Sequence, residues 1–199
     1  SIRNRTDGQI QLLVCEHPPL ITIGRGSPPH SPLCVGKRSG GHWIDTHWVK
    51  RGGGCLFHAP GQLSVYPIVP LQWHGFTIGE YLRRLESAVR RTLRQLGVEV
   101  EQGSAFAGRT GSLAALGVTV RDWVAYNGAF ISVSPPVALL RFFDRWSPER
   151  NRVSSLVAER QGPVRMATVR AEVVRQVAQA LGCDRYHLHT GHPLLRTGE

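Results

Sequence analysis

The stretch "RGGGCLFHAPGQL" at residues 51–63 places three consecutive glycines, a histidine and a Pro-Gly pair inside one short apolar run. Gly52 to Gly54 lack side chains where a strand would normally carry them, so another group must approach this backbone closely. A bulged strand and a hairpin turn both fit the pattern. A phosphate-binding loop fits less well, because neither a Lys-Ser/Thr pair nor a helix start follows. The functional interpretation is a strand edge where a ligand lies on bare backbone, beside Arg51 and His58.

The composition is typical of a folded protein. The chain has 199 residues, of which 41% are hydrophobic, so we expect one domain over residues 1–199. No apolar run approaches the roughly 20 residues of a membrane helix, and the first residues lack the apolar core of a signal peptide. We therefore expect no membrane association. Four scattered cysteines without a Cys-x-x-Cys pair argue against a zinc site and a disulfide framework, and predict a cytoplasmic protein without a metal or cofactor.

The chain is strongly basic, with a formal net charge of +10, and only Lys37 and Lys50 are lysines. This charge is compatible with nucleic acid, with acidic protein partners, or with a genome that favours arginine codons. The aromatic residues are not interleaved with arginines as in a recognisable RNA-binding signature. We therefore expect no nucleic-acid partner, and the charge leaves acidic protein partners and arginine codon bias open.

Short β-like runs fill the first third of the chain and resume after residue 97. They are rich in β-branched and aromatic residues and are separated by glycine and proline. Residues 27–41 read as a long loop. The pattern predicts strands at 10–16, 20–24, 42–49, 55–59, 63–69, 98–101, 111–120 and 123–134.

Two segments switch to helical periodicity. The capping box Thr77-x-x-Glu80 opens a helix over residues 77–96, and Gly97 ends it. A second helix is predicted over residues 168–181. The fold class is therefore α/β (α+β), a mixed β-sheet with flanking helices. The first helix carries a basic face that is either simply solvated or docks a partner: Arg83, Arg84, Arg90, Arg91 and Arg94.

The extended stretch "RGGGCLFHAPGQLSVYPI" resembles the signature of lipoyl(octanoyl) transferases, which move octanoyl from acyl carrier protein to a lipoyl-domain lysine. Biotin and lipoate ligases carry a similar glycine-rich strand. "EHPPLITIGR" (16–25), "GSLAALGVTVRDWVAYNGAFISV" (111–133) and "FFDRWSPE" followed by "VSSL" are similar to further family blocks in the same order. The resemblance implies the catalytic-domain fold of the biotin and lipoate ligases. It also implies an octanoyl or lipoyl ligand and, as partners, acyl carrier protein or a lipoyl-domain protein.

In the family the acyl chain lies in a tunnel whose wall includes the glycine run. Glycines let a slender apolar chain pack directly on backbone, and exposed N–H groups can meet the thioester oxygen. The resemblance implies an acyl-binding set made of Arg51, Gly52, Gly53, Gly54, His58, Ala115, Leu116, Gly117, Gly128, Ala129 and Phe130.

The chain departs from the family at both catalytic positions. The family uses a cysteine nucleophile and a nearby lysine that lowers the thiol pKa. Here Glu149 stands at the cysteine position and Ser112 at the lysine position. No cysteine lies between Cys55 and Cys183, and no lysine follows Lys50. The resemblance therefore implies an altered active site.

Two hypotheses follow for the activity, and they leave open whether the chain is an enzyme. The first is an acyltransferase that positions thioester and amine for direct transfer, without a covalent intermediate. The second is a pseudoenzyme that keeps the acyl groove, or binds the carrier partner, but lacks the chemistry. Cys55 is an alternative nucleophile, although a small cysteine within a strand is ordinarily a packing residue.

Overall fold

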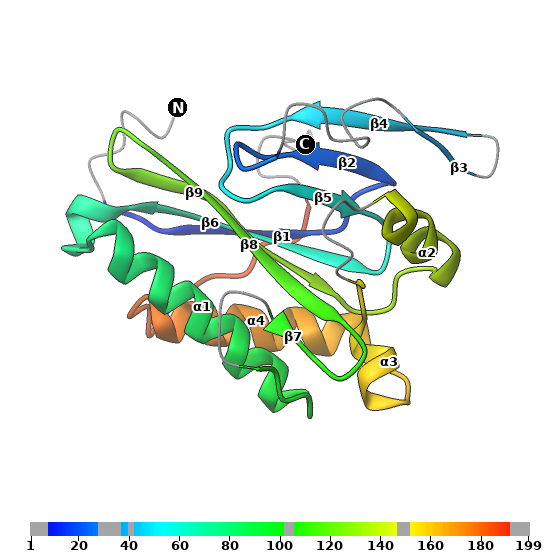
Figure 1. Cartoon of the computed structure of the whole chain (residues 1–199). Coiled ribbons are helices and arrows are strands. Elements are labelled where there is room, and N and C mark those ends of the chain that lie inside the picture. Colours follow the sequence, from blue (N-terminus) through cyan, green and yellow to red (C-terminus); the bar gives the residue numbers. More distant parts are fainter. Residues whose placement is uncertain (1–7, 28–36, 40–41, 102–105, 147–151, 192–199) are drawn as a thin grey trace, which may run out of the picture.

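The computed structural model describes residues 8–27, 37–39, 42–101, 106–146 and 152–191 (Figure 1). The strands form two sheets. An antiparallel five-stranded sheet has the order β1 (Gln11–Cys15), β6 (Gln62–Pro70), β9 (Val124–Ser132), β8 (Ser112–Arg121) and β7 (Phe106–Ala107). A four-stranded sheet has the order β3 (Lys37–Ser39), β4 (His42–Trp48), β2 (Leu20–Ile23) and β5 (Cys55–His58), with β2 and β4 parallel.

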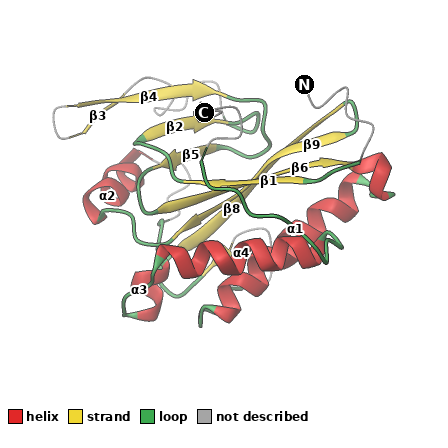
Figure 2. Ribbon diagram, turned by 180° about the vertical axis from the view of Figure 1, so that it is seen from behind, coloured by secondary structure: helices red, strands yellow, loops and turns green. Residues whose placement is uncertain are grey.

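The molecule is layered. Helices α1 (Ile78–Gln95) and α4 (Met166–Ala180) cover one face of the five-stranded sheet, and the four-stranded sheet lies on its other side (Figures 1 and 2). Three shorter helices complete the described chain: η3 (Leu71–His74), α2 (Val137–Trp146) and α3 (Leu156–Arg160). None of the helices in the described ranges combines the length and apolarity that a membrane span requires.

Successive side chains of β6 and β9 point to opposite faces of the five-stranded sheet, and the two faces carry different kinds of residue. Leu63, Val65, Ala129 and Ile131 are fully buried in the core that the sheet forms with α1 and α4. The intervening residues point to the opposite face, toward the four-stranded sheet, because successive side chains of a strand alternate. The strand register places Gln62 opposite Ser132 and Ser64 opposite Phe130 on that face.

The predicted fold class and both long helices are confirmed. Thr77 caps α1 by accepting a hydrogen bond from the Glu80 N–H at 3.1 Å, as the capping box requires. The strand predicted at 98–101 is wrong, because these residues adopt no strand conformation: only the Glu101 N–H donates to the Ala107 carbonyl of β7, at 3.0 Å, and Val98 packs into the helix-side core. The loop predicted at 27–41 contains β3, and α2 and α3 were not predicted.

The strands are divided between two sheets, and β5 and β6, which follow each other in the chain, belong to different ones. The Ala59-Pro60-Gly61 turn carries the chain from one sheet to the other. Gly61 has a φ of +87°, and a Cβ there would lie 2.5 Å from the Ser134 carbonyl oxygen. The Gly61 N–H donates to Glu16 Oε2 at 2.9 Å, which ties the turn to the end of β1. Only glycine fits this crossing.

Candidate functional site

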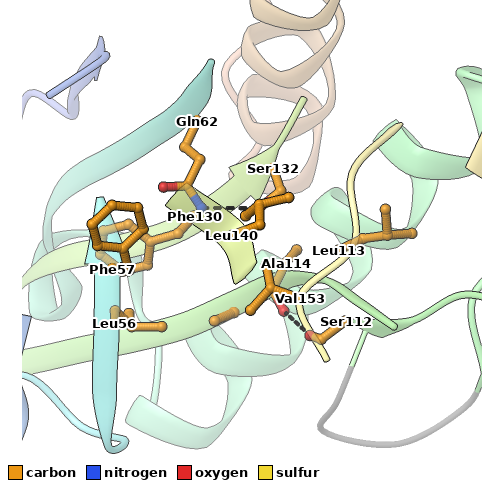
Figure 3. A pocket seen from close by; sticks show the side chains of 11 residues that line it. Leu56, Phe57, Gln62, Ser112, Leu113, Ala114, Phe130, Ser132, Leu140 and Val153 are labelled. Atoms are coloured by element: carbon orange, nitrogen blue, oxygen red, sulfur yellow. Dashed lines mark hydrogen bonds between the residues drawn. The ribbon is translucent and has the colours of Figure 1, made fainter. Parts of the chain in front are cut away.

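A cavity of about 70 Å³ lies where the two sheets meet (Figure 3). That volume is several times what one water molecule needs. Two of its side chains come from β5 of the four-stranded sheet, and most of the others come from β6, β8 and β9 of the five-stranded sheet. The lining residues are Leu56, Phe57, Gln62, Ser112, Leu113, Ala114, Ala115, Phe130, Ser132, Leu140 and Val153.

The cavity lining is mostly apolar and contains three polar side chains. Gln62 Nε2 donates to Ser132 Oγ at 3.0 Å, and the buried Gln62 Oε1 has no hydrogen-bond partner within the described chain. Ser112 Oγ donates to the Ala114 carbonyl at 3.2 Å (Figure 3). None of the lining residues is a cysteine, histidine, lysine or carboxylate. Such a lining fits an apolar group and supplies neither an ionic partner nor a nucleophilic thiol.

Residues 24–26 and strand β8 make the close approach that the glycine run requires. The N–H groups of Gly24 and Gly26 donate to the carbonyls of Gly54 and Gly53 at 3.1 and 2.9 Å. The Gly52 N–H donates to the Val118 carbonyl at 3.0 Å. A Cβ on Gly24 would lie 2.3 Å from the Gly53 carbonyl oxygen, whereas a Cβ on Gly52 or Gly53 would meet its nearest atom at 3.5 or 3.6 Å, so the close approach excludes a side chain at Gly24. The bare backbone is therefore used for packing between segments of this chain.

Arg51 is buried beneath the glycine run, with 1% of its surface exposed. Its Nη1 donates to the carbonyls of Gly54 and Gly52 at 2.7 and 3.1 Å, and its Nη2 donates to the Thr22 carbonyl at 2.7 Å. Burial lowers the pKa of Arg51 to about 10, so the guanidinium stays protonated at neutral pH. The side chain therefore fixes the shape of the glycine run through hydrogen bonds to backbone.

His58 belongs to a neutral ring cluster behind Phe130. Its Nε2 lies 2.8 Å from Thr22 Oγ1, and its ring contacts His17 and Phe130 at centroid distances of 5.4 and 4.9 Å. His17 Nε2 lies 2.9 Å from the Tyr66 hydroxyl. Burial, together with the nearby His17 and Arg51, lowers the pKa of His58 to about 3. Burial also lowers the pKa of His17 and raises that of Tyr66. The cluster is therefore uncharged at neutral pH.

Glu159 holds the start of β8, where Ser112 lies. Its carboxylate accepts hydrogen bonds from the backbone N–H groups of Arg109 and Thr110 at 2.8 Å, from the Thr110 hydroxyl, and from Ser154 Oγ at 2.8 Å. Burial alone would raise the pKa of Glu159, but these hydrogen bonds outweigh it and keep that pKa below its usual value. The Ser112 N–H donates to the Arg152 carbonyl at 2.8 Å. Nothing in the local sequence pattern pointed to this clamp.

The structure places the sequence-derived site residues in different parts of the molecule. Ser112, Ala115 and Phe130 line the cavity, while Arg51, His58 and Gly52 to Gly54 lie outside its lining. Gly117 packs beneath Arg51, and Gly128 lies against the backbone of Val65. Leu116 and Ala129 belong to the helix-side core, and Glu149 lies outside the described residues.

Cys55 is half-buried, with its Sγ 3.1 Å from Ser27 Oγ, and it is not among the residues that line the cavity. Sequence reasoning also missed several lining residues, among them Leu56, Phe57, Gln62, Leu140 and Val153. Alternation along β6 and β9 would have found Gln62. The others meet the cavity only through contacts between distant segments. Within the described ranges, no three His, Cys, Asp or Glu side chains are placed to hold a metal ion.

Comparison with known proteins places this arrangement in a family. The octanoyltransferase of Synechococcus elongatus is 33% identical over 196 residues, covering 92% of this chain and 78% of that protein. The octanoyltransferase of Rubrobacter xylanophilus is 35% identical over 193 residues, covering 91% and 84%.

Solved structures show the same fold at lower identity. A crystal structure of lipoate-protein ligase A bound with ATP superposes with a TM-score of 0.70 at 16% identity, covering 91% of this chain and 76% of that one. A bipartite lipoate protein ligase from Thermoplasma acidophilum gives 0.68 at 18% identity, covering 87% and 72%. The lipoyl protein ligase A/B catalytic-domain model matches residues 2–178. The chain therefore belongs to the lipoyl protein ligase A/B catalytic-domain family.

Proposed function

We propose that this protein is an octanoyl- or lipoyl-transferase-like protein of lipoate metabolism that binds an acyl group in the cavity between its two sheets. The observation that carries the proposal is the cavity lining, which is apolar except for Gln62, Ser112 and Ser132. An alkyl chain gains free energy by leaving water for such a lining. The similar octanoyltransferases support the choice of octanoyl as the acyl group.

The transfer proceeds by direct attack, without an acyl-cysteine. The acceptor amine nitrogen attacks the thioester carbonyl carbon, a C–N bond forms, the C–S bond breaks, and the leaving thiol takes the proton released by the amine. The protein contributes binding and orientation, which can supply a large part of a barrier reduction. This route is proposed because the family resemblance puts Ser112 and Glu149 at the lysine and cysteine positions, and because no cysteine lies at 56–182.

A second candidate is a pseudoenzyme that binds the acyl group or its carrier without transferring it. One observation favours it: the cavity lining contains no thiol, imidazole or amine that could act as nucleophile or base. The two candidates share the cavity and differ only in turnover, so one experiment with two readouts separates them.

The experiment incubates the protein with octanoyl-loaded acyl carrier protein, with and without a lipoyl domain, and weighs every component by intact mass spectrometry. Octanoate binding is measured in parallel by calorimetry. Ala115→Phe fills the cavity and should abolish binding, whereas Ala138→Phe, on the exposed side of α2, is the matched control.

Octanoyl transfer that Ala115→Phe abolishes supports the transferase. Binding without transfer supports the pseudoenzyme. An octanoyl adduct on Cys55, which Cys55→Ser removes, overturns direct attack. Absence of octanoate binding in the unsubstituted protein overturns the acyl cavity, and with it the transferase and the pseudoenzyme that binds the acyl group.

A further inference from the structure

One buried polar atom borders the cavity without a hydrogen-bond partner. Within the described chain, four buried side-chain oxygen atoms lack a partner: Gln62 Oε1, Thr46 Oγ1, Tyr81 Oη and Gln176 Oε1. Of these four residues, only Gln62 belongs to the cavity lining. A buried acceptor that has lost water and gained no partner is costly. Its position at a cavity therefore points to a group that enters the cavity and donates to it.

The other polar groups of the described lining are already engaged. Ser132 lies opposite Gln62 in the strand register, is 5% exposed, and accepts a hydrogen bond from Gln62 Nε2 at 3.0 Å. Ser112 donates its hydroxyl hydrogen to the Ala114 carbonyl at 3.2 Å. The Gln62 carbonyl oxygen lies on the side of the amide that faces away from Ser132 (Figure 3). The Gln62 amide is therefore an open hydrogen-bonding group in a mostly apolar lining.

The surroundings restrict which polar group can occupy this position. The described lining contains no charged side chain, so an ammonium or a carboxylate would be buried there without a counter-charge. A hydroxyl is small and neutral, and it can donate a hydrogen bond to the Gln62 oxygen. If the amide turns so that its oxygen accepts from the Ser132 hydroxyl, a ligand hydroxyl can instead accept a hydrogen bond from Nε2. A hydroxyl therefore satisfies the open group of Gln62 in either orientation of the amide.

We propose that Gln62 makes the cavity selective for a hydroxyacyl chain, an acyl chain that carries a hydroxyl group, over the plain chain of the same length. This inference rests on the proposed function, because the chain must enter the cavity for its hydroxyl to reach Gln62. A plain alkyl chain displaces water from the Gln62 oxygen and leaves that oxygen unpaired, whereas a hydroxyl replaces the water with a hydrogen bond. A site with such an open polar group discriminates against the ligand that lacks the matching group.

The test measures, by calorimetry, the affinity for octanoate and for a series of hydroxyoctanoates with the hydroxyl at successive carbons. All probes share the carboxylate, so the differences in affinity report the hydroxyl alone. On the unsubstituted protein, one position of the hydroxyl should bind about tenfold more tightly than octanoate. Hydroxyls that do not reach Gln62 should bind more weakly than octanoate, because they are buried without a partner.

Three variants assign this preference to Gln62. Gln62→Leu and Gln62→Met, of which the second keeps the length of the side chain, should both lose the preference and bind octanoate best. Gln179→Leu, at an exposed position of α4, is the matched control and should keep the preference. Circular dichroism checks that each variant is folded. The comparison of ligands on the unsubstituted protein tests the selectivity even where a Gln62 variant fails to fold.

Each failure has a different meaning. Equal affinity for octanoate and all hydroxyoctanoates, which is the result expected if a water molecule stays on the Gln62 amide, overturns the selectivity while the acyl cavity stands. An equal preference for every position of the hydroxyl overturns it as well, because no fixed group then reads the hydroxyl. A preference that persists in Gln62→Met overturns the role of Gln62. Absence of binding for every probe overturns the acyl cavity of the proposed function, and this inference with it.

Discussion

The two faces of the five-stranded sheet are built from the same strands and differ in almost every physical property. On the helix face, Leu63, Val65, Ala129 and Ile131 are fully buried against α1 and α4. On the opposite face, the alternate residues Gln62, Ser64, Phe130 and Ser132 include three polar side chains. One face therefore supplies the main core, and the other supplies the cavity.

The difference shows how one strand pair can serve stability and ligand binding together. Aliphatic side chains make up the helix face and are fully buried, as in the close-packed interior of a folded protein. Short hydroxyl side chains on the other face leave space beneath the four-stranded sheet, and Phe130 and Phe57 border that space. Substitutions on the helix face should therefore change stability, and substitutions on the cavity face should mainly change binding.

Neighbouring residues of β9 provide the strongest test of this difference. Ile131→Ala removes a fully buried side chain from the helix-side core and should lower the free energy of unfolding by about 3–4 kcal/mol. Ser132→Ala removes one hydrogen-bond partner of Gln62 and should cost about 1 kcal/mol. Urea denaturation measures both values. Equal losses at the two positions would contradict the assignment of the faces.

Local patterns predicted most of the helices and strands because those patterns are set by neighbouring residues. The capping box at Thr77 and the alternation in β6 and β9 are examples. The division into two sheets could not be read in the same way, since β5 and β6 are separated by only three residues and pair with different strands. Strand pairing depends on segments that are distant in the sequence. The turn residues Ala59 to Gly61 allow the chain to pass from one sheet to the other, but they do not determine which strands β5 and β6 pair with.

The candidate site was predictable to a similar degree. The glycine run correctly required a close backbone approach, but the approaching segment, residues 24–26, could not be deduced from local spacing. Ser112 and Phe130 were found through the family resemblance, and both line the cavity. Leu140 and Val153 reach the cavity from segments without periodic signals, so only the folded chain shows their role.

The contact between residues 24–26 and the glycine run 52–54 allows a comparison of two glycines. Gly24 is tightly packed against backbone, and Gly52 is not. Gly24→Ala places a Cβ 2.3 Å from the Gly53 carbonyl and 2.7 Å from Arg51 Nη1, so it should destabilise the protein by about 2–3 kcal/mol. Gly52→Ala meets its nearest atom, the Val118 carbonyl oxygen, at 3.5 Å, which is an ordinary contact. Thermal and urea unfolding of both variants check the difference. A Gly24→Ala protein as stable as Gly52→Ala would show that residues 24–26 do not constrain the glycine run.

The smallest expected effect concerns the ring cluster of His17, His58 and Tyr66 beside Phe130. It tests whether water is excluded from the space between the two sheets. The pKa of His58 is lowered to about 3 in the folded protein, from about 6.5 in an unfolded chain. The unfolded state therefore binds a proton first as the pH falls, so the stability that His58 contributes is complete above about pH 7 and decreases below it. Between pH 7 and pH 5 the free energy of unfolding should fall by about 2 kcal/mol from His58 alone. His17 contributes in the same direction, because burial lowers its pKa as well. Glu159, whose pKa lies below its usual value, loses its contribution to the free energy of unfolding only at lower pH.

His58→Gln should flatten the pH dependence between pH 7 and pH 5, whereas His187→Gln at an exposed position should leave it unchanged. Urea denaturation at closely spaced pH values gives the slope, and the same slope in His58→Gln would mean that the ring is hydrated and that the layer between the sheets is open.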